Sequence, residues 1–234
     1  GFYKNRILKL YPIYYFICGL VIVRALAYPF FGESLVSFPP EALAIGALAN
    51  STLFGSDWLM FLQWEGSNLQ FGSFVNSELP LWQMLLVPQS WSIGIELMFY
   101  LIAPLLCKVK TMTLTLLGMA LLLARFASYL SGLDQDPWTY RFFPFELPIF
   151  VLGILLYRIH ESRQFSRIPL KKIYPFLIIV YVIFSFLTNK LSINRFWQML
   201  VLITLTSIVI MWGEEKSKDK KLGELSYPIY MVHV

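Results

Sequence analysis

Apolar residues along this chain form long runs that are separated by short polar stretches. A run of about 20 apolar residues can cross the hydrocarbon core of a bilayer as a helix. The pattern therefore predicts an all-α fold, a polytopic transmembrane helix bundle of about seven complete spans plus a truncated eighth near Leu222. The expected apolar segments are residues 11–30, 41–62, 89–106, 112–130, a span that begins with 146–157, 173–187 and 196–212.

Basic residues indicate which ends of these segments face the cytoplasm. Lys4, Arg6 and Lys9 precede the first run, so the first helix is expected to run outward. Lys108 and Lys110 follow residues 89–106, so that helix is expected to run inward. Residues 131–145 then form an outer loop, and the basic stretch after residue 157 faces the cytoplasm.

This orientation constrains the chain between the two helices. If residues 41–62 crossed once as a helix, the segment 89–106 would begin on the wrong side. Either 41–62 or the short apolar piece 81–87 must be re-entrant or paired with a further crossing. We therefore expect a re-entrant segment before Trp91, within a loop that is otherwise polar over residues 63–80.

Composition excludes an ordinary soluble domain, since 57% of the 234 residues are hydrophobic, 14% are charged and the mean hydropathy is +0.63. The net charge of +5 does not indicate nucleic-acid binding, because the basic residues lie in short loops between apolar runs. Cys18 and Cys107 each lie in an apolar run, which favours packing over a disulfide or a metal site. We expect one transmembrane domain over residues 1–234, incomplete at both ends.

Glu96 is an ionisable residue inside an apolar run, QSWSIGIELMFYLIAPLL. Such residues usually face a bundle interior or a water-filled cavity. Ser92, Glu96 and Tyr100 recur at four-residue intervals and share one face of the predicted helix. This polar stripe indicates a functional site, or a purely structural hydrogen bond to a neighbouring helix.

Arg24 and Arg125 are the other charged residues within apolar runs. Counted from the helix ends, both arginines and Glu96 lie roughly 8 to 9 Å from the outer boundary, at 1.5 Å per residue. This common depth makes either arginine a candidate charge partner of Glu96. Alternatively, each arginine reaches the outer interface independently through its long side chain.

The helix around Glu96 also resembles a known family. The pattern W-S-[IL]-x-x-E-x-x-F-Y-L-x-x-P-L-L resembles the signature of the membrane acyltransferase-3 family, whose members move an acyl group, often acetyl, from cytoplasmic coenzyme A to an extracytoplasmic sugar hydroxyl. The matching residues are Trp91, Ser92, Glu96, Phe99, Tyr100 and Pro104.

Two further matches lie near the ends of the chain. Arg6, Lys9 and Pro12 are similar to the family's R-x-x-R followed by [IL]-x-P, with Lys in place of the second Arg. Position alone would make Arg6 and Lys9 a cytoplasmic anchor, and the resemblance implies that they hold the phosphates of coenzyme A. The closing S-Y-x-x-Y-x-x-H pattern is matched by Ser226, Tyr227, Tyr230 and His233. From the sequence alone, His233 could equally be a packing or interfacial histidine.

The resemblance implies an integral membrane O-acyltransferase of the bacterial cytoplasmic membrane. It would use acyl-CoA, with acetyl-CoA expected, as a donor substrate rather than a permanently bound cofactor, and would modify a cell-envelope carbohydrate. The expected catalytic residues are Glu96, His233, Ser92 and Tyr100, with Arg24, Arg125, Trp91, Tyr227 and Tyr230 as structural or charge partners and no metal. The family usually places its base on a histidine in a helix before the Arg6 motif, so the base is expected outside this chain. A fragment without that helix lacks its principal catalytic group.

Two other functions are compatible with the same residues. In a non-enzymatic transporter, Arg24, Glu96 and Arg125 would form a polar substrate or proton site within the membrane. In a membrane protein that acts only as a structural partner, the polar stripes would not form a functional site.

Overall fold

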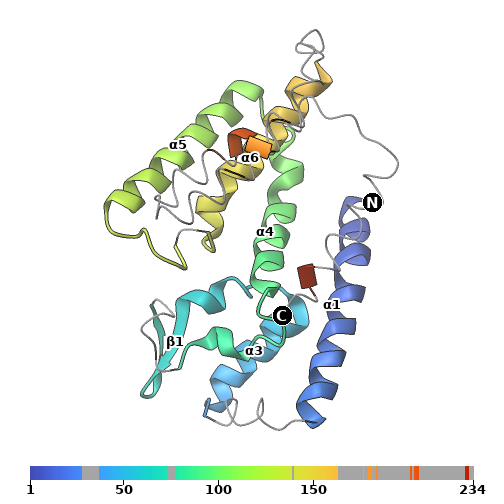
Figure 1. Ribbon diagram of the computed structural model, residues 1–234, viewed down its shortest axis with the longest axis vertical. Coiled ribbons are helices and arrows are strands. Elements are labelled where there is room, and N and C mark those ends of the chain that lie inside the picture. Colours follow the sequence, from blue (N-terminus) through green and yellow to red (C-terminus); the bar gives the residue numbers. More distant parts are fainter. Residues whose placement is uncertain are drawn as a thin grey trace.

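The computed structural model describes residues 1–27, 37–72, 77, 79–138 and 140–162, together with short helical pieces at 176, 179–180, 183, 201, 203–205 and 230–231. In Figure 1, α1 (Phe2–Ala27) lies beside the central helix α4 (Ser90–Leu106), and the pair α5 (Thr111–Leu130) and α6 (Phe143–Glu161) lies near one end of α4. A lobe of short elements, which we call the 37–87 lobe, surrounds the other end (Figure 1).

α1 and α4 run in opposite directions and meet through large side chains. Tyr3 donates a hydrogen bond of 3.3 Å to the carbonyl of Leu101, near the C-terminal end of α4. Further along α1, Tyr14 is fully buried in a core cluster that includes Ile93 and Leu97 of α4. The antiparallel orientation follows from these contacts and is visible in Figure 1. It agrees with the predicted outward first helix and inward helix at 89–106.

Tyrosines of α1 also bind the end of α3 (Pro40–Thr52). The hydroxyls of Tyr11 and Tyr14 donate to the carbonyls of Thr52 and Asn50 at 2.5 and 2.9 Å, and Tyr15 donates to Ser51. The last carbonyls of a helix have no partner within it, so these phenols satisfy groups that would otherwise be costly to bury.

Residues 41–62 do not form the single long helix that their apolar pattern predicts. α3 ends at Thr52 and is capped by Leu53, a non-glycine residue with φ 61°, and Gly55 follows with φ 79°. The 13 residues of α3 extend about 20 Å, less than the roughly 30 Å of bilayer hydrocarbon. The prediction of a second span here is wrong. The parity argument is supported, because α1 ends and α4 begins on the same side of the structure (Figure 1).

The predicted loop at 63–80 contains regular structure. After the 3-10 helix η1 (Trp58–Phe61), strands β1 (Leu62–Glu65) and β2 (Asn68–Phe71) pair antiparallel in the register Leu62 to Phe71. Gly66, at φ 58°, makes the two-residue turn possible. A second 3-10 helix, η3 (Leu81–Met84), packs on α3 and leads into α4.

Among the described helices, α5 and α6 form the most closely packed pair. Gly118 of α5 lets Val151 of α6 approach, since a Cβ at position 118 would lie 3.1 Å from the Val151 Cγ1. At the end of α6, Arg158 donates to the Cys107 carbonyl at 2.8 Å and to Thr111 Oγ1 at 3.0 Å. These bonds fix α6 to the turn between α4 and α5.

Two of the described helices, α1 and α5, are long and apolar enough to cross a membrane, and α4 is a shorter apolar helix of 17 residues. The described part of the chain is mostly helical, as predicted. The expected count of about seven spans is not confirmed. The segments at 173–187 and 196–212 and the eighth helix lie outside the described residues, apart from the short pieces given above.

Ser56 and Asp57 are buried between the 37–87 lobe and α4, with exposed fractions of 0% and 2%. Ser56 donates to the carbonyls of Leu53 and Ser90 at 2.8 and 2.9 Å. Asp57 Oδ1 is buried without a hydrogen-bond partner among the described residues. Gly94 permits this approach, because a Cβ there would lie 2.6 Å from Ser56 Oγ and 2.9 Å from Asp57 Oδ1.

Asp57 makes a prediction about stability. Burial raises the pKa of its carboxyl from 3.8 to about 6, so the folded chain binds this proton more tightly than the unfolded chain. The group's contribution to stability is full below about pH 4 and is lost as the pH rises toward 6, by roughly 3 kcal/mol. Asp57→Asn should therefore raise the thermal unfolding midpoint of the detergent-solubilised protein at pH 7.5 and flatten its pH dependence. Asp134→Asn, at an exposed acid, is the control, and an identical response of both variants would contradict the assignment.

Candidate functional site

Glu96, Tyr100 and Arg6 come together where α4 meets the beginning of α1. The Tyr100 hydroxyl donates to Glu96 Oε1. The Arg6 guanidinium lies 4.7 Å from the centroid of the Tyr100 ring and 5.3 Å from that of Phe2. The Phe2 and Tyr100 rings meet edge to face at 5.8 Å. We call these four residues the Arg6 cluster.

The Arg6 cluster explains how α4 tolerates a carboxylate. Glu96 is partly buried, accepts a hydrogen bond from Tyr100, and shares that phenol with a guanidinium. A charged group in an apolar setting is stabilised by a nearby opposite charge and by hydrogen bonds. Tyr100 supplies the hydrogen bond and also links Glu96 to the Arg6 cation, whose contact with the Tyr100 ring is a cation–π interaction.

The predicted common depth of Arg24, Arg125 and Glu96 is wrong. Because α4 is antiparallel to α1, Tyr100 lies beside Arg6, and Arg24 lies about five turns beyond Arg6, roughly 27 Å along the helix. Arg24 is exposed in the last turn of α1. The depth count used helix ends that were read from hydropathy alone, whereas the register between two helices depends on which side chains interlock.

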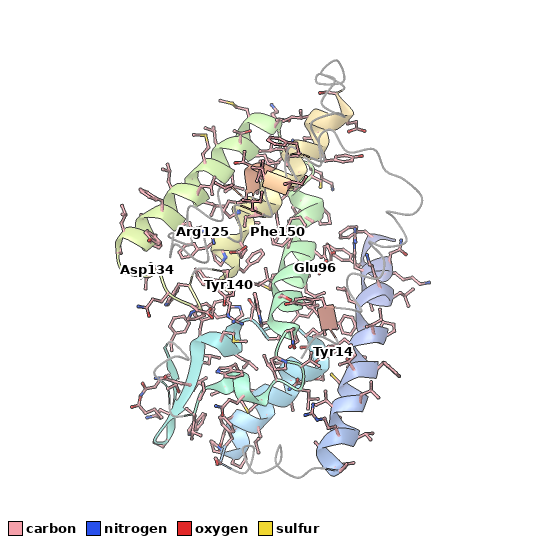
Figure 2. The ribbon with its side chains drawn as sticks, viewed as in Figure 1. Tyr14, Glu96, Arg125, Asp134, Tyr140 and Phe150 are labelled. Atoms are coloured by element: carbon pink, nitrogen blue, oxygen red, sulfur yellow. The ribbon has the colours of Figure 1, made fainter. Side chains whose placement is uncertain are left out.

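Arg125 binds Glu146 of α6, so the predicted pairing with Glu96 is also wrong. Its Nη1 lies 3.0 Å from Glu146 Oε1 and 2.5 Å from the Phe145 carbonyl oxygen. The two side chains are 9% and 16% exposed. Figure 2 shows Arg125 within the α5–α6 pair, whereas Glu96 lies on α4. The sequence interpretation treated Glu146 only as the start of a span and missed it as a partner.

Ser92 is the least engaged member of the predicted stripe. Its Oγ donates to the Gln89 carbonyl at 2.9 Å, a bond within the first turn of α4. Of the three residues in the stripe, Glu96 and Tyr100 bond to one another. Lys9 is exposed on α1 and lies outside the Arg6 cluster.

The closing motif reaches the same region through one described residue. Met231 is fully buried in the core cluster that contains Leu10 and Tyr14 of α1 and Leu97 of α4. The dark red segment at the end of the chain accordingly lies between α1 and α4 in Figure 1. Tyr230 is 42% exposed. Ser226, Tyr227 and His233 lie outside the described residues.

A second polar and aromatic group lies at the N-terminal end of α4. Arg141 places its guanidinium 4.4 Å from the Trp91 ring centroid and 4.9 Å from that of Tyr140. Asp136 accepts from Arg141 Nε at 2.7 Å and from the Tyr140 hydroxyl at 2.8 Å. Arg141 also contacts Met60 Sδ at 3.7 Å. We call Trp91, Asp136, Tyr140 and Arg141 the Arg141 cluster.

The Tyr140 phenol of the Arg141 cluster keeps its proton at neutral pH. Burial raises the pKa of the Tyr140 phenol, and its hydrogen bond to Asp136 raises the pKa further, so Tyr140 remains a donor. The sequence interpretation placed Asp136 and Arg141 in an outer loop without assigning them a role. Their pairing depends on a turn that brings Arg141 back to Asp136, which apolar periodicity does not report. Among the described residues, no group of three metal-ligating side chains is present.

Comparison with known proteins identifies the family. The sequence matches the family described as an acyltransferase domain over residues 1–234. The chain belongs to the membrane acyltransferase-3 family. An uncharacterized protein of Aquifex aeolicus (strain VF5) is 24% identical over 152 residues, which cover 63% of this chain and 68% of that protein. No solved structure matches the chain significantly.

The family assignment makes this membrane protein an acyltransferase and an enzyme. The geometry of the structure also removes the support for a transporter site, because the three residues proposed for that site do not meet. In the acyltransferase, Arg24 is exposed near the end of α1, Arg125 pairs with Glu146, and Glu96 belongs to the Arg6 cluster.

The Arg125–Glu146 assignment is tested by a double-mutant cycle. Glu146→Leu leaves the Arg125 charge buried without its carboxylate and should lower the free energy of unfolding by about 3–5 kcal/mol. The double variant Arg125→Met/Glu146→Leu should recover most of that loss, since an apolar pair can replace a buried ion pair. Chemical unfolding in detergent measures both effects. A large coupling energy between Arg125 and Glu96 in the same assay would restore the pairing rejected above.

Proposed function

We propose that this acyltransferase moves an acetyl group from cytoplasmic acetyl-CoA to a hydroxyl of an extracytoplasmic carbohydrate, as a multi-pass protein of the bacterial cytoplasmic membrane that modifies the cell envelope. One observation carries the proposal. Residues from two motifs far apart in the sequence, at Arg6 and at Glu96–Tyr100, form one contact group within a family match that spans residues 1–234. The buried Met231 brings the closing motif to the same helices.

Arg6 is suited to the donor side of this reaction. It lies in the first turns of α1, where Lys4 and Lys9 are also exposed, so the local charge favours a polyphosphate. The N–H groups of a guanidinium lie in its plane, so a guanidinium that stacks on a ring can still donate pairs of hydrogen bonds to phosphate oxygens at its edge. We therefore assign Arg6 to a phosphate of coenzyme A, with Lys9 as a second cation.

The reaction itself is an acyl transfer. The acceptor oxygen bonds to the thioester carbonyl carbon, the carbon–sulfur bond breaks, and the acceptor proton ends on the coenzyme A thiol through a base. Glu96 holds the Tyr100 phenol and balances the Arg6 charge, so we assign it a positioning role beside the donor. Tyr100 donates a hydrogen bond to Glu96 and contacts Arg6 through its ring, so it links the positions of these two residues. The family resemblance leaves the base to a histidine before the Arg6 motif, and His233 is proposed as a further contributor.

The first test replaces the carboxylate of Glu96. Glu96→Gln keeps the shape of the side chain but removes its charge, so Arg6 loses its nearby balancing carboxylate. In the full-length protein we expect at least a tenfold loss of acetyl transfer from radiolabelled acetyl-CoA, about 1.4 kcal/mol of transition-state stabilisation. Membrane insertion, measured by protease protection, should not change. Full activity of this variant would disprove the assigned role.

The second test separates Arg6 from other cations on the same helix. Arg6→Gln should raise the KM for acetyl-CoA about tenfold or more, because a charge-assisted phosphate contact is lost. Arg24→Gln is the matched control, since it removes an arginine from the exposed far end of α1. Steady-state kinetics at varied acetyl-CoA would measure both. An equal rise in KM for the two variants would mean that Arg6 acts only through the overall positive charge and makes no specific phosphate contact.

A further inference from the structure

Phe71, at the end of β2, presents an aromatic ring to the surface. One side of the ring stacks on the buried Phe61, with centroids 5.7 Å apart and planes at 9°. Trp138 meets it edge-on at 5.8 Å and 62°. Phe71 is nevertheless 55% exposed. The ring is therefore fixed from behind and from one edge while much of its surface remains accessible.

Polar groups that can bind hydroxyls lie next to this ring. Trp138 belongs to the same turn as Asp136, Tyr140 and Arg141. The Arg141 cluster therefore adjoins the group of rings that Trp138 forms with Phe61 and Phe71. The Arg141 and Asp136 side chains are 16% and 18% exposed, and both are planar groups with several hydrogen-bonding positions. Their mutual ion pair and the Tyr140 bond hold them in place before any ligand arrives.

The site lies at the end of α4 opposite to the Arg6 cluster. Trp91 contacts Arg141 in the first turn of α4, and Tyr100 contacts Arg6 in its second half. Their separation of nine positions corresponds to roughly 13.5 Å along the helix. If Arg6 faces the acyl donor on the cytoplasmic side, the Arg141 cluster faces the opposite side, where the acceptor approaches.

We propose that Phe71 and Trp138, together with Asp136, Tyr140 and Arg141, form the binding site for the carbohydrate acceptor. This inference rests on the proposed function. A pyranose ring has an apolar face of C–H groups, which stacks on an aromatic ring, and a rim of hydroxyls, which bonds to planar polar side chains. Phe71 supplies the first kind of surface and the Asp136–Arg141 pair supplies the second.

The surroundings favour a carbohydrate over the lipid interface. β2 presents the exposed Leu69 and Phe71 on one face and the exposed polar residues Asn68 and Gln70 on the other, and Asp134 is exposed in the neighbouring loop. Leu69 and Phe71 are the two apolar residues of this short strand. A segment that inserts into a bilayer would present apolar residues to the acyl chains. An aromatic ring with a carboxylate and a guanidinium in the neighbouring turn is suited to a hydroxyl-rich ligand in water.

The test is a binding and transfer experiment on the full-length protein in nanodiscs, with a panel of methyl glycosides of hexoses and N-acetylhexosamines. Wild-type protein should bind at least one glycoside, detected by titration of tryptophan fluorescence, and acetylate it from acetyl-CoA. Phe71→Ala should weaken that binding about tenfold and raise the acceptor KM to match. The KM for acetyl-CoA should not change. Arg141→Lys should have a similar effect, because lysine keeps the charge but loses the planar fork.

The control and the outcomes separate this site from the proposed reaction. Gln70→Ala alters the next residue of the same strand, whose side chain points to the opposite face, and should leave both KM values unchanged. If the wild type transfers acetyl to a glycoside but Phe71→Ala and Arg141→Lys keep its acceptor KM, the site is wrong and the reaction stands. If the wild type binds and acetylates no glycoside, both proposals fail. Quenching of the tryptophan signal by brominated lipid, lost in Phe71→Ala, would instead make the ring a membrane contact.

Discussion

The arrangement of this chain depends on the side-chain packing between α1 and α4. Leu10, Tyr14 and Ile17 share one buried cluster with Ile93 and Leu97, and Leu53, Val87 and Met231 complete it, so this shared core sets the register of two antiparallel helices. Side chains in packed interiors accept only a few arrangements, so the register cannot drift by part of a turn. Arg6 meets Tyr100 because of that register, although neither residue belongs to the buried set. The chemistry at the end of α1 is a consequence of apolar packing further along it.

Charged side chains in the described helices are accommodated locally. Arg125 has Glu146 on the neighbouring helix, and Arg6 has an aromatic ring and a nearby carboxylate. Arg141, in the turn before α6, has both kinds of partner, a carboxylate and two aromatic rings. Each arrangement limits the cost of placing a charge in apolar surroundings. The aromatic contacts also fix the orientation of the guanidinium plane, which a solvated arginine would not have.

The sequence predicted the motif helix almost to the residue, at 89–106 against the observed Ser90–Leu106, because an apolar run between a polar start and Cys107 has few alternatives. It also predicted that α1 and α4 run in opposite directions, since lysines and arginines mark the cytoplasmic ends of helices. It could not predict the break after Thr52, where Leu53 takes a left-handed conformation that its residue type does not favour. The Arg125–Glu146 pair and the contact of Arg6 with Tyr100 were missed for a similar reason, because pairing between helices depends on tertiary register. The resemblance supplied what periodicity could not, namely the expectation that Arg6 and Glu96 belong to the same site.

Gly94 couples α4 mechanically to the 37–87 lobe. The missing side chain lets the backbone of α4 lie against Ser56 and Asp57 so closely that nothing can slide between them. Tilting or rotating α4 would drive its backbone into a buried carboxylate, so the helix and the 37–87 lobe must move as one body. Ser56, whose hydroxyl donates to the carbonyls of Leu53 and Ser90, joins the same two parts from the side of the lobe. The break after α3 and the start of α4 therefore keep one fixed spacing.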